Sequence, residues 1–183
     1  SEMCIRDSFR IVIGSPVYTS AFTPHTEPLT VITNTKLLTC QNPYFKDNST
    51  VGATPTIGGD PETSRLSPYL ITAQYNKATH GGSVYFDKLN DHITVAASSA
   101  FDFGTGAFTI EWGQWWDGAH TAYGSVYDNN YSTNPNLVIQ TSNNDQRYNV
   151  YMNGTSATFL ESSSATINTW NHYALVRKGT TVT

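Results

Sequence analysis

Apolar and polar residues alternate along several short segments of this chain, and no segment shows the 3.6-residue repeat of an amphipathic helix. The clearest alternation covers residues 108–112 (FTIEW), in which the first, third and fifth side chains are apolar. Residues 148–152 (YNVYM) alternate in the same way and lead into Asn153-Gly154, a pair typical of tight β-hairpin turns. The pattern therefore predicts β-strands joined by turns.

Shorter runs of the same kind extend this prediction along the chain. They predict strands at residues 9–13, 36–41, 54–57, 83–86, 92–95, 124–127, 137–141 and 170–177. Thr, Val and aromatic residues are common and only 13% of residues are charged, which favours strands over helices. Many short strands separated by turn residues indicate an all-β sandwich or barrel.

The two ends of the chain differ from this pattern. Residues 1–8 (SEMCIRDS) show no strand or helix periodicity, and we expect an extraneous or artefactual segment outside the fold. Residues 23–28 (TPHTEP) predict a Pro-rich linker. At the other end, Lys178-Gly179-Thr180 predicts a turn whose partner strand begins where the sequence stops, so we expect an incomplete domain.

Composition and charge exclude several classes of protein. The net charge is −4 and the chain has no basic run, which argues against binding nucleic acid. No apolar stretch approaches the roughly 20 residues of a membrane-spanning helix, so we expect no membrane insertion. Two cysteines cannot form a disulfide framework, and this sequence carries no signal peptide pattern.

Two blocks of sequence carry a family resemblance. Residues 81–112 combine a Gly-Gly pair, a strand ending in Phe-Asp, a turn ending in Asn-Asp, and Phe-Asp-Phe-Gly-Thr-Gly followed by Phe-Thr-Ile-Glu. This block resembles the front half of a laminin-G-like domain of the concanavalin A-like lectin/glucanase superfamily. Residues 168–177 (NTWNHYALVR) are similar to a later strand of that family. The chain departs from the pattern at Gly113, where the family usually has Trp.

The resemblance implies a fold and an organisation. Residues 29–183 are expected to form an antiparallel two-sheet jelly-roll sandwich, truncated at the C-terminus. Residues 9–28 resemble the closing strand and exit linker of a preceding copy, so we expect a tandem-repeat protein. Similar arrays occur in viral tail or fibre proteins and in bacterial surface proteins.

Catalytic patterns are absent from the sequence. Glucanases of this fold use a Glu-x-Asp-x-x-Glu strand to pair carboxylates, and none of the five glutamates here is followed by Asp two residues later. We expect Glu111 to face solvent on its strand. The five histidines show no metal-binding spacing. We therefore expect a protein that is not an enzyme.

Two Asp- and Asn-rich loops are candidate calcium sites, because Ca²⁺ prefers oxygen ligands. One comprises Asp87, Asn90 and Asp91. The other, which we favour, is centred on Asp128, Asn130 and Asn136. The alternative for both is an ordinary turn, in which such side chains cap the backbone.

Aromatic residues between positions 115 and 131 form a candidate sugar-binding surface, since sugar rings stack on Trp and Tyr. The candidate ligand-binding residues are Trp115, Trp116, Asp117, Tyr123, Tyr127 and Tyr131. Adjacent Trp115 and Trp116 must point to opposite faces of a strand, so we expect one in the core. We also expect Trp112 and Trp170 in the core.

These observations favour a non-catalytic module that binds carbohydrate or a cell surface. Its expected partners are a glycan or cell-surface polysaccharide and neighbouring repeats of the same chain. The expected location is extracellular, on a cell surface or virion. Two alternatives remain: a structural spacer without ligand, and a glucanase-like hydrolase, which the missing carboxylate motif disfavours.

Overall fold

The computed structural model describes residues 4–69, 81–87, 89–118, 124–129, 137–142, 146–152 and 160–183. Within these residues the regular elements are antiparallel β-strands and one 3₁₀ turn, η1 (Ser99–Phe101). The predicted all-β fold is confirmed. None of the helices in the described part of the chain is long and apolar enough to cross a membrane.

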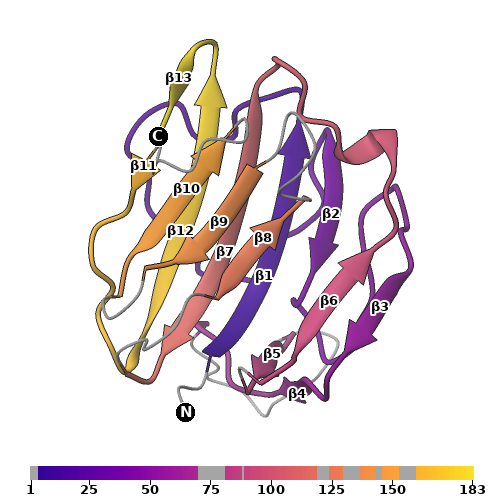
Figure 1. Cartoon of the computed structure of the whole chain (residues 1–183), viewed down its shortest axis with the longest axis vertical. Coiled ribbons are helices and arrows are strands. Elements are labelled where there is room, and N and C mark those ends of the chain that lie inside the picture. Colours follow the sequence, from indigo (N-terminus) through magenta and orange to yellow (C-terminus); the bar gives the residue numbers. More distant parts are fainter. Residues whose placement is uncertain are drawn as a thin grey trace. The chain divides into compact units, whose positions relative to one another are not determined.

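The chain divides into two compact units, residues 3–115 with 170–183, and residues 116–169. The first unit contains a sheet in the order β13-β12-β7-β1-β5-β4, with β2 also paired to β1 (Figure 1). The strands of this sheet are β1 (Cys4–Ile13), β2 (Thr35–Thr39), β4 (Glu62–Ser64), β5 (Ser83–Phe86), β7 (Phe108–Trp116), β12 (Thr169–Lys178) and β13 (Thr181–Val182). The turn at Lys178-Gly179-Thr180 is followed within the chain by β13, which pairs antiparallel with β12, whereas the sequence placed the partner strand where the chain stops.

β1 lies at the centre of this sheet. Its first half pairs with β5 and its second half with β2, and Ile11 and Val12 are fully buried. The expectation that residues 1–8 lie outside the fold is therefore wrong for residues 4–8, which belong to β1. The periodicity was hidden because Asp7 and Ser8 are both buried, and Ser8 has a positive φ of 53° that interrupts the alternation. Residues 9–13, assigned by sequence to a preceding copy, share this sheet with strands from residues 35–182.

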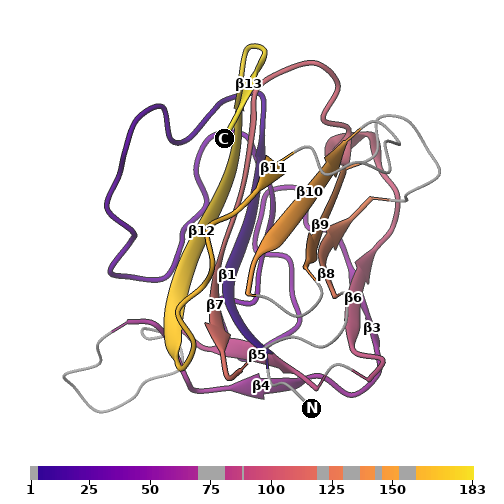
Figure 2. The ribbon, with the colours of Figure 1, turned by 60° about the vertical axis from the view of Figure 1, so that its left-hand side comes forward.

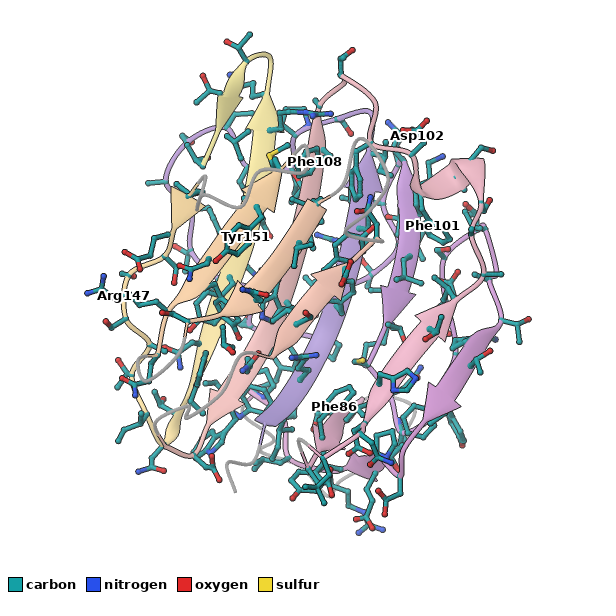
Figure 3. All side chains as sticks on the ribbon, in the orientation of Figure 1. Phe86, Phe101, Asp102, Phe108, Arg147 and Tyr151 are labelled. Atoms are coloured by element: carbon teal, nitrogen blue, oxygen red, sulfur yellow. The ribbon has the colours of Figure 1, made fainter. Side chains whose placement is uncertain are left out.

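One face of β7 supplies an apolar core. Phe108, Ile110 and Trp112 are 0%, 0% and 2% exposed, which confirms the alternation predicted for residues 108–112. Trp112 stacks on Tyr173 of β12 at 5.3 Å between ring centroids and contacts Phe9 of β1 at 6.3 Å. Phe108, labelled in Figure 3, also carries the guanidinium of Arg177 over its ring.

A smaller two-stranded sheet also belongs to the first unit. β3 (Pro55–Gly58) pairs with β6 (His92–Val95), as expected for a short edge strand that contains Pro55. Ile93 of β6 packs against a buried cluster of Cys40, Val84 and Phe86.

The second unit contains a four-stranded sheet in the order β11-β10-β9-β8. Its strands are β8 (Ser125–Asp128), β9 (Leu137–Thr141), β10 (Tyr148–Met152) and β11 (Leu160–Glu161). β10 and β11 are antiparallel neighbours, with Val150 opposite Leu160, as the predicted hairpin requires. Its turn at Asn153-Gly154 lies outside the described residues.

Candidate functional site

The two neighbouring tryptophans at the end of β7 point in opposite directions. Trp116 is 1% exposed and its ring lies 5.5 Å from that of Tyr148. Trp115 is half-buried. One tryptophan is thus in a core and the other reaches the surface, as the strand geometry predicts.

Trp115 pairs with Trp170 of β12. Their ring centroids lie 6.1 Å apart and the ring planes meet at 74°, an edge-to-face contact. The prediction that Trp170 is a core residue is wrong, because Trp170 is half-buried, whereas Trp112 is in the core as predicted. The side chain of Trp112 enters the apolar face of β7, and Trp115, three residues later, lies on the other face.

The remaining predicted ligand residues belong to the second unit, whereas Trp115 belongs to the first. Asp117 and Tyr127 are half-buried residues of the second unit. Burial, with the nearby charge of Asp128, raises the pKa of Tyr127. Tyr123 and Tyr131 lie outside the described residues, and Trp116 is in the core.

Glu111 lies on the same face of β7 as Trp115, and among the described residues of the first unit it is the charged residue with the lowest exposure. Its side chain is 0% exposed, and Arg10 of β1, 3% exposed, holds Oε1 with its Nε at 2.7 Å and its Nη2 at 2.5 Å. The expectation that Glu111 faces solvent is wrong. The alternation placed Glu111 opposite the apolar core, but this second face is covered too.

The cover is a strap, defined as residues 14–34, which leaves β1 and returns to β2. Figure 2 shows it standing off one side of the sheet of β1, β7 and β12. Hydrogen bonds attach it to the sheet, among them Gly14 N to Ala107 O at 2.8 Å, Val17 N to Thr109 Oγ1 at 2.9 Å, and Arg10 Nη1 to Thr30 O at 2.7 Å.

Tyr18 attaches the strap to Glu111 directly. Its hydroxyl donates to Glu111 Oε2, and the same oxygen lies 3.4 Å from His172 Nε2. Burial works against the charged form of Glu111, but hydrogen bonds from His172 and Tyr18 and the charge of Arg10 outweigh it and lower its pKa. Burial and the Glu111 carboxylate raise the pKa of Tyr18.

The strap also carries an aromatic cluster. Phe22 stacks on Tyr18 with ring centroids 3.6 Å apart and meets His172 edge-to-face at 5.6 Å. His25 Nε2 lies 3.0 Å from the Tyr18 hydroxyl, and desolvation of its ring lowers the pKa of His25. Phe22 is 41% exposed although its ring contacts both Tyr18 and His172.

Gly113 lies between Glu111 and Trp115 on β7, and a Cβ added there would make ordinary van der Waals contacts with its neighbours. A Cβ at this position would lie 3.4 Å from the carbonyl oxygen of Asp7 and 3.9 Å from Cγ of Pro68.

The three candidate residues of one calcium loop, Asp87, Asn90 and Asp91, lie within the described residues. Carboxylate oxygens of Asp60, Asp87 and Asp91 lie within 4.8 Å of one another, and Asp91 accepts the backbone N–H groups of Asp60 at 2.7 Å and Asp87 at 2.8 Å. Hard oxygen ligands of this type suit Ca²⁺. In the favoured loop Asp128 is exposed on β8, and Asn130 and Asn136 lie outside the described residues.

Sequence reasoning did not single out His172, Tyr18 and Phe22 as site residues, and it placed Trp170 in the core. The signal for two of them was present, since Trp170 and His172 are two residues apart on a strand and must share a face. No local signal places the strap residues, because their position depends on contacts with residues 92 and 93 positions away, Thr109 and Glu111.

Comparison with protein-family models, with curated proteins and with solved structures finds no match to this chain.

Proposed function

We propose that this chain is a non-catalytic carbohydrate-binding module whose binding surface is the Trp115–Trp170 pair. The observation that carries the proposal is that two large aromatic rings are only half-buried, on the face of β7 and β12 opposite the apolar core. Rings with an apolar body and a polar N–H suit ligands that have both apolar and polar faces. Both rings are braced by each other, which reduces the entropy lost on binding.

The wider proposal places this module in a tandem array on a cell surface or virion, with a jelly-roll sandwich of the laminin-G-like kind. The antiparallel sheets and the sequence blocks at residues 81–112 and 168–177 support it. Weak single-sugar sites gain avidity when copies are linked, which suits a repeated module. The carboxylate of Glu111 is engaged by Arg10, Tyr18 and His172, an arrangement that serves structure better than proton transfer to a substrate.

The test is a glycan-array screen of the purified chain, run with calcium and again with chelator. We expect binding that survives the chelator and falls about tenfold or more in Trp115→Ala, the loss typical of an aromatic hot spot. Tyr44→Ala is the matched control, because Tyr44 is a 55% exposed aromatic residue elsewhere in the same unit.

Three results would overturn the proposal. Equal binding by wild type and Trp115→Ala would place the site elsewhere. Binding that disappears with chelator would place it on a metal loop, for which Asp60, Asp87 and Asp91 are the first residues to change. No binding by a chain that circular dichroism shows to be folded would favour the structural spacer.

A further inference from the structure

We propose that residues 65–69 form a pH-gated flap, which closes over Asp7 of β1 while this residue is a neutral acid and is released when it ionises. The flap is the segment that follows β4 in the chain. The inference concerns the chain without a ligand, so it is independent of the carbohydrate-binding proposal.

Asp7 is a buried carboxyl group whose partners are hydroxyl groups rather than a cation. The residue is 1% exposed. Its Oδ1 accepts the hydroxyl of Ser8, and its Oδ2 lies 3.4 Å from Oγ of Ser67 in the flap. Among the described residues Asp7 forms no ion pair, whereas the equally buried Glu111 is held by Arg10. A buried charge without an opposite charge is costly, so this site favours the neutral acid.

The ionisable groups near Asp7 do not offset the cost of burying its charge. The ionisable side chains on the elements packed around it are Arg6, Arg10, Cys40, Arg65, Tyr69 and Glu111. The two arginines of β1 have other partners, Glu111 and the ring of Phe86, and Arg65 is exposed. Burial raises the pKa of Tyr69, so its phenol is neutral near pH 7. Burial also raises the pKa of Asp7 to about 7, against the smaller opposing effect of its two hydrogen bonds.

The flap is the part of the surroundings of Asp7 that can move most easily. Its hydrogen bonds to the sheet include Ser67 Oγ to Asp7 Oδ2 at 3.4 Å, Tyr69 Oη to Ser8 Oγ at 3.5 Å, and the Ser83 hydroxyl to Leu66 O. The first two are at the long limit of hydrogen-bond distances. Leu66 is 43% exposed, so the flap buries little apolar surface there. Local opening of such a segment requires less free energy than separation of the sheet around β1.

Ser8, next to Asp7, has an unusual backbone conformation. Its φ of 53° lies in the left-handed region that residues other than glycine seldom adopt. The amide of Ser8 donates to Cys40 O at 3.2 Å, and its Oγ accepts the amide of Leu29 at 3.4 Å and the hydroxyl of Tyr69. Strained conformations persist where the surroundings hold them, and they are frequent in switch regions. The buried acid and the strained residue therefore lie together under the flap.

Trypsin cleavage of the Arg65–Leu66 bond measures flap opening, because cleavage follows the population of the open form when opening is fast. Rates are measured from pH 5 to pH 8.5 and divided by those of a synthetic peptide of residues 62–69. The closed form binds a proton that the open form releases above the ordinary pKa of 3.8, so its stability falls as the pH rises towards about 7. We expect the normalised rate to rise by up to about tenfold per pH unit between pH 5 and 7 and then to level off.

Asp7→Asn provides the decisive variant, because it keeps the shape of the neutral acid and cannot ionise. We expect slow cleavage at Arg65 that does not change with pH. Asp102→Asn is the matched control, since Asp102 is exposed, and it should keep the pH dependence of the wild type. Should Asp7→Asn fail to fold, carbon-13 NMR of the Asp7 carboxyl group in the wild type decides. A titration midpoint near 7 is expected, and a midpoint near 4 would overturn the proposal.

Cleavage of the Arg10–Ile11 bond separates flap opening from unfolding. Arg10 is 2% and Ile11 is 0% exposed in β1, so we expect this bond to stay resistant throughout the pH range. Cleavage there that rises in parallel with cleavage at Arg65 would show that the whole sheet opens, and the flap would be wrong. A wild-type rate at Arg65 that does not change with pH, or an Asp7→Asn rate that rises as in the wild type, would overturn it as well. No outcome depends on a glycan, so the two proposals can fail separately.

Discussion

The two faces of β7 are both covered, but by different means. On one face, Phe108, Ile110 and Trp112 pack against other apolar side chains. On the other, Glu111 is equally buried because Arg10 and the strap enclose it. Apolar packing tolerates imperfect partners, whereas a buried charge depends on each partner being present. Side chains on the two faces are thus equally buried, but the stability of the Glu111 face depends more strongly on its specific partners than that of the apolar face does.

The largest expected effect comes from removing one member of the ion pair. Glu111→Ala should destabilise the fold by about 3–5 kcal/mol, because it leaves Arg10 charged, buried and unpaired. The measurement is chemical denaturation of each variant. The double variant Arg10→Met with Glu111→Leu should lose much less stability, since no uncompensated charge remains. A double variant as unstable as the single one would show that the face depends on the shape of these side chains rather than on their charges.

The second prediction compares tryptophans on the two faces. Trp112→Ala should cost about 3–5 kcal/mol, because it leaves a cavity between Phe9 and Tyr173. Trp170→Ala should cost about 1–2 kcal/mol, because a half-buried ring loses less apolar contact. Thermal melts of both variants test the difference. Equal losses would mean that Trp170 supports the fold as Trp112 does, which would weaken its assignment to a binding surface.

The difference between the faces also explains how much was predictable. The apolar face of β7 follows from the alternation at residues 108–112, and most strands were placed within two residues of their observed bounds. Residues 4–8 were missed because Asp7 and Ser8 interrupt the apolar pattern with buried polar side chains. Glu111 was misplaced for a different reason, because it fits the alternation but the strap covers the face on which it lies.

The candidate site was predictable only in part, and the reason is physical. Local periodicity fixes which face of a strand a side chain occupies, so the divergence of Trp115 and Trp116 followed from sequence. Periodicity does not reveal which distant segment covers that face. The strap reaches Glu111 through Tyr18, 93 positions away, and such contacts leave no local trace in the sequence.

The smallest expected effect is the pH dependence of the free energy of unfolding, to which the buried carboxylates Glu111 and Asp7 contribute. The pKa of Glu111 is lowered from its usual value of 4.5 in the folded chain, so its ionised form contributes stability that is fully present above pH 4.5. This contribution is lost as the pH falls through the lowered pKa, by about 1.4 kcal/mol for each unit of depression. Asp7 acts in the opposite sense at higher pH, because burial raises its pKa to about 7 and its contribution falls as the pH rises from about 4 to about 7.

The test is to measure the free energy of unfolding from pH 8 to pH 2.5. The quantity to compare between variants is its change with pH, not its absolute value. Glu111→Gln should flatten the loss of stability below pH 4.5, whereas the changes between pH 4.5 and 7 come from Asp7, whose pKa is raised, and from His25, whose pKa is lowered. Glu161→Gln is the matched control, since its carboxylate pairs with Arg147 at the surface with 44% of its side chain exposed. If Glu111→Gln and Glu161→Gln changed the acid slope equally, the polar face of β7 would contribute no more to acid sensitivity than an exposed ion pair, and the contrast between the two faces would be one of packing alone.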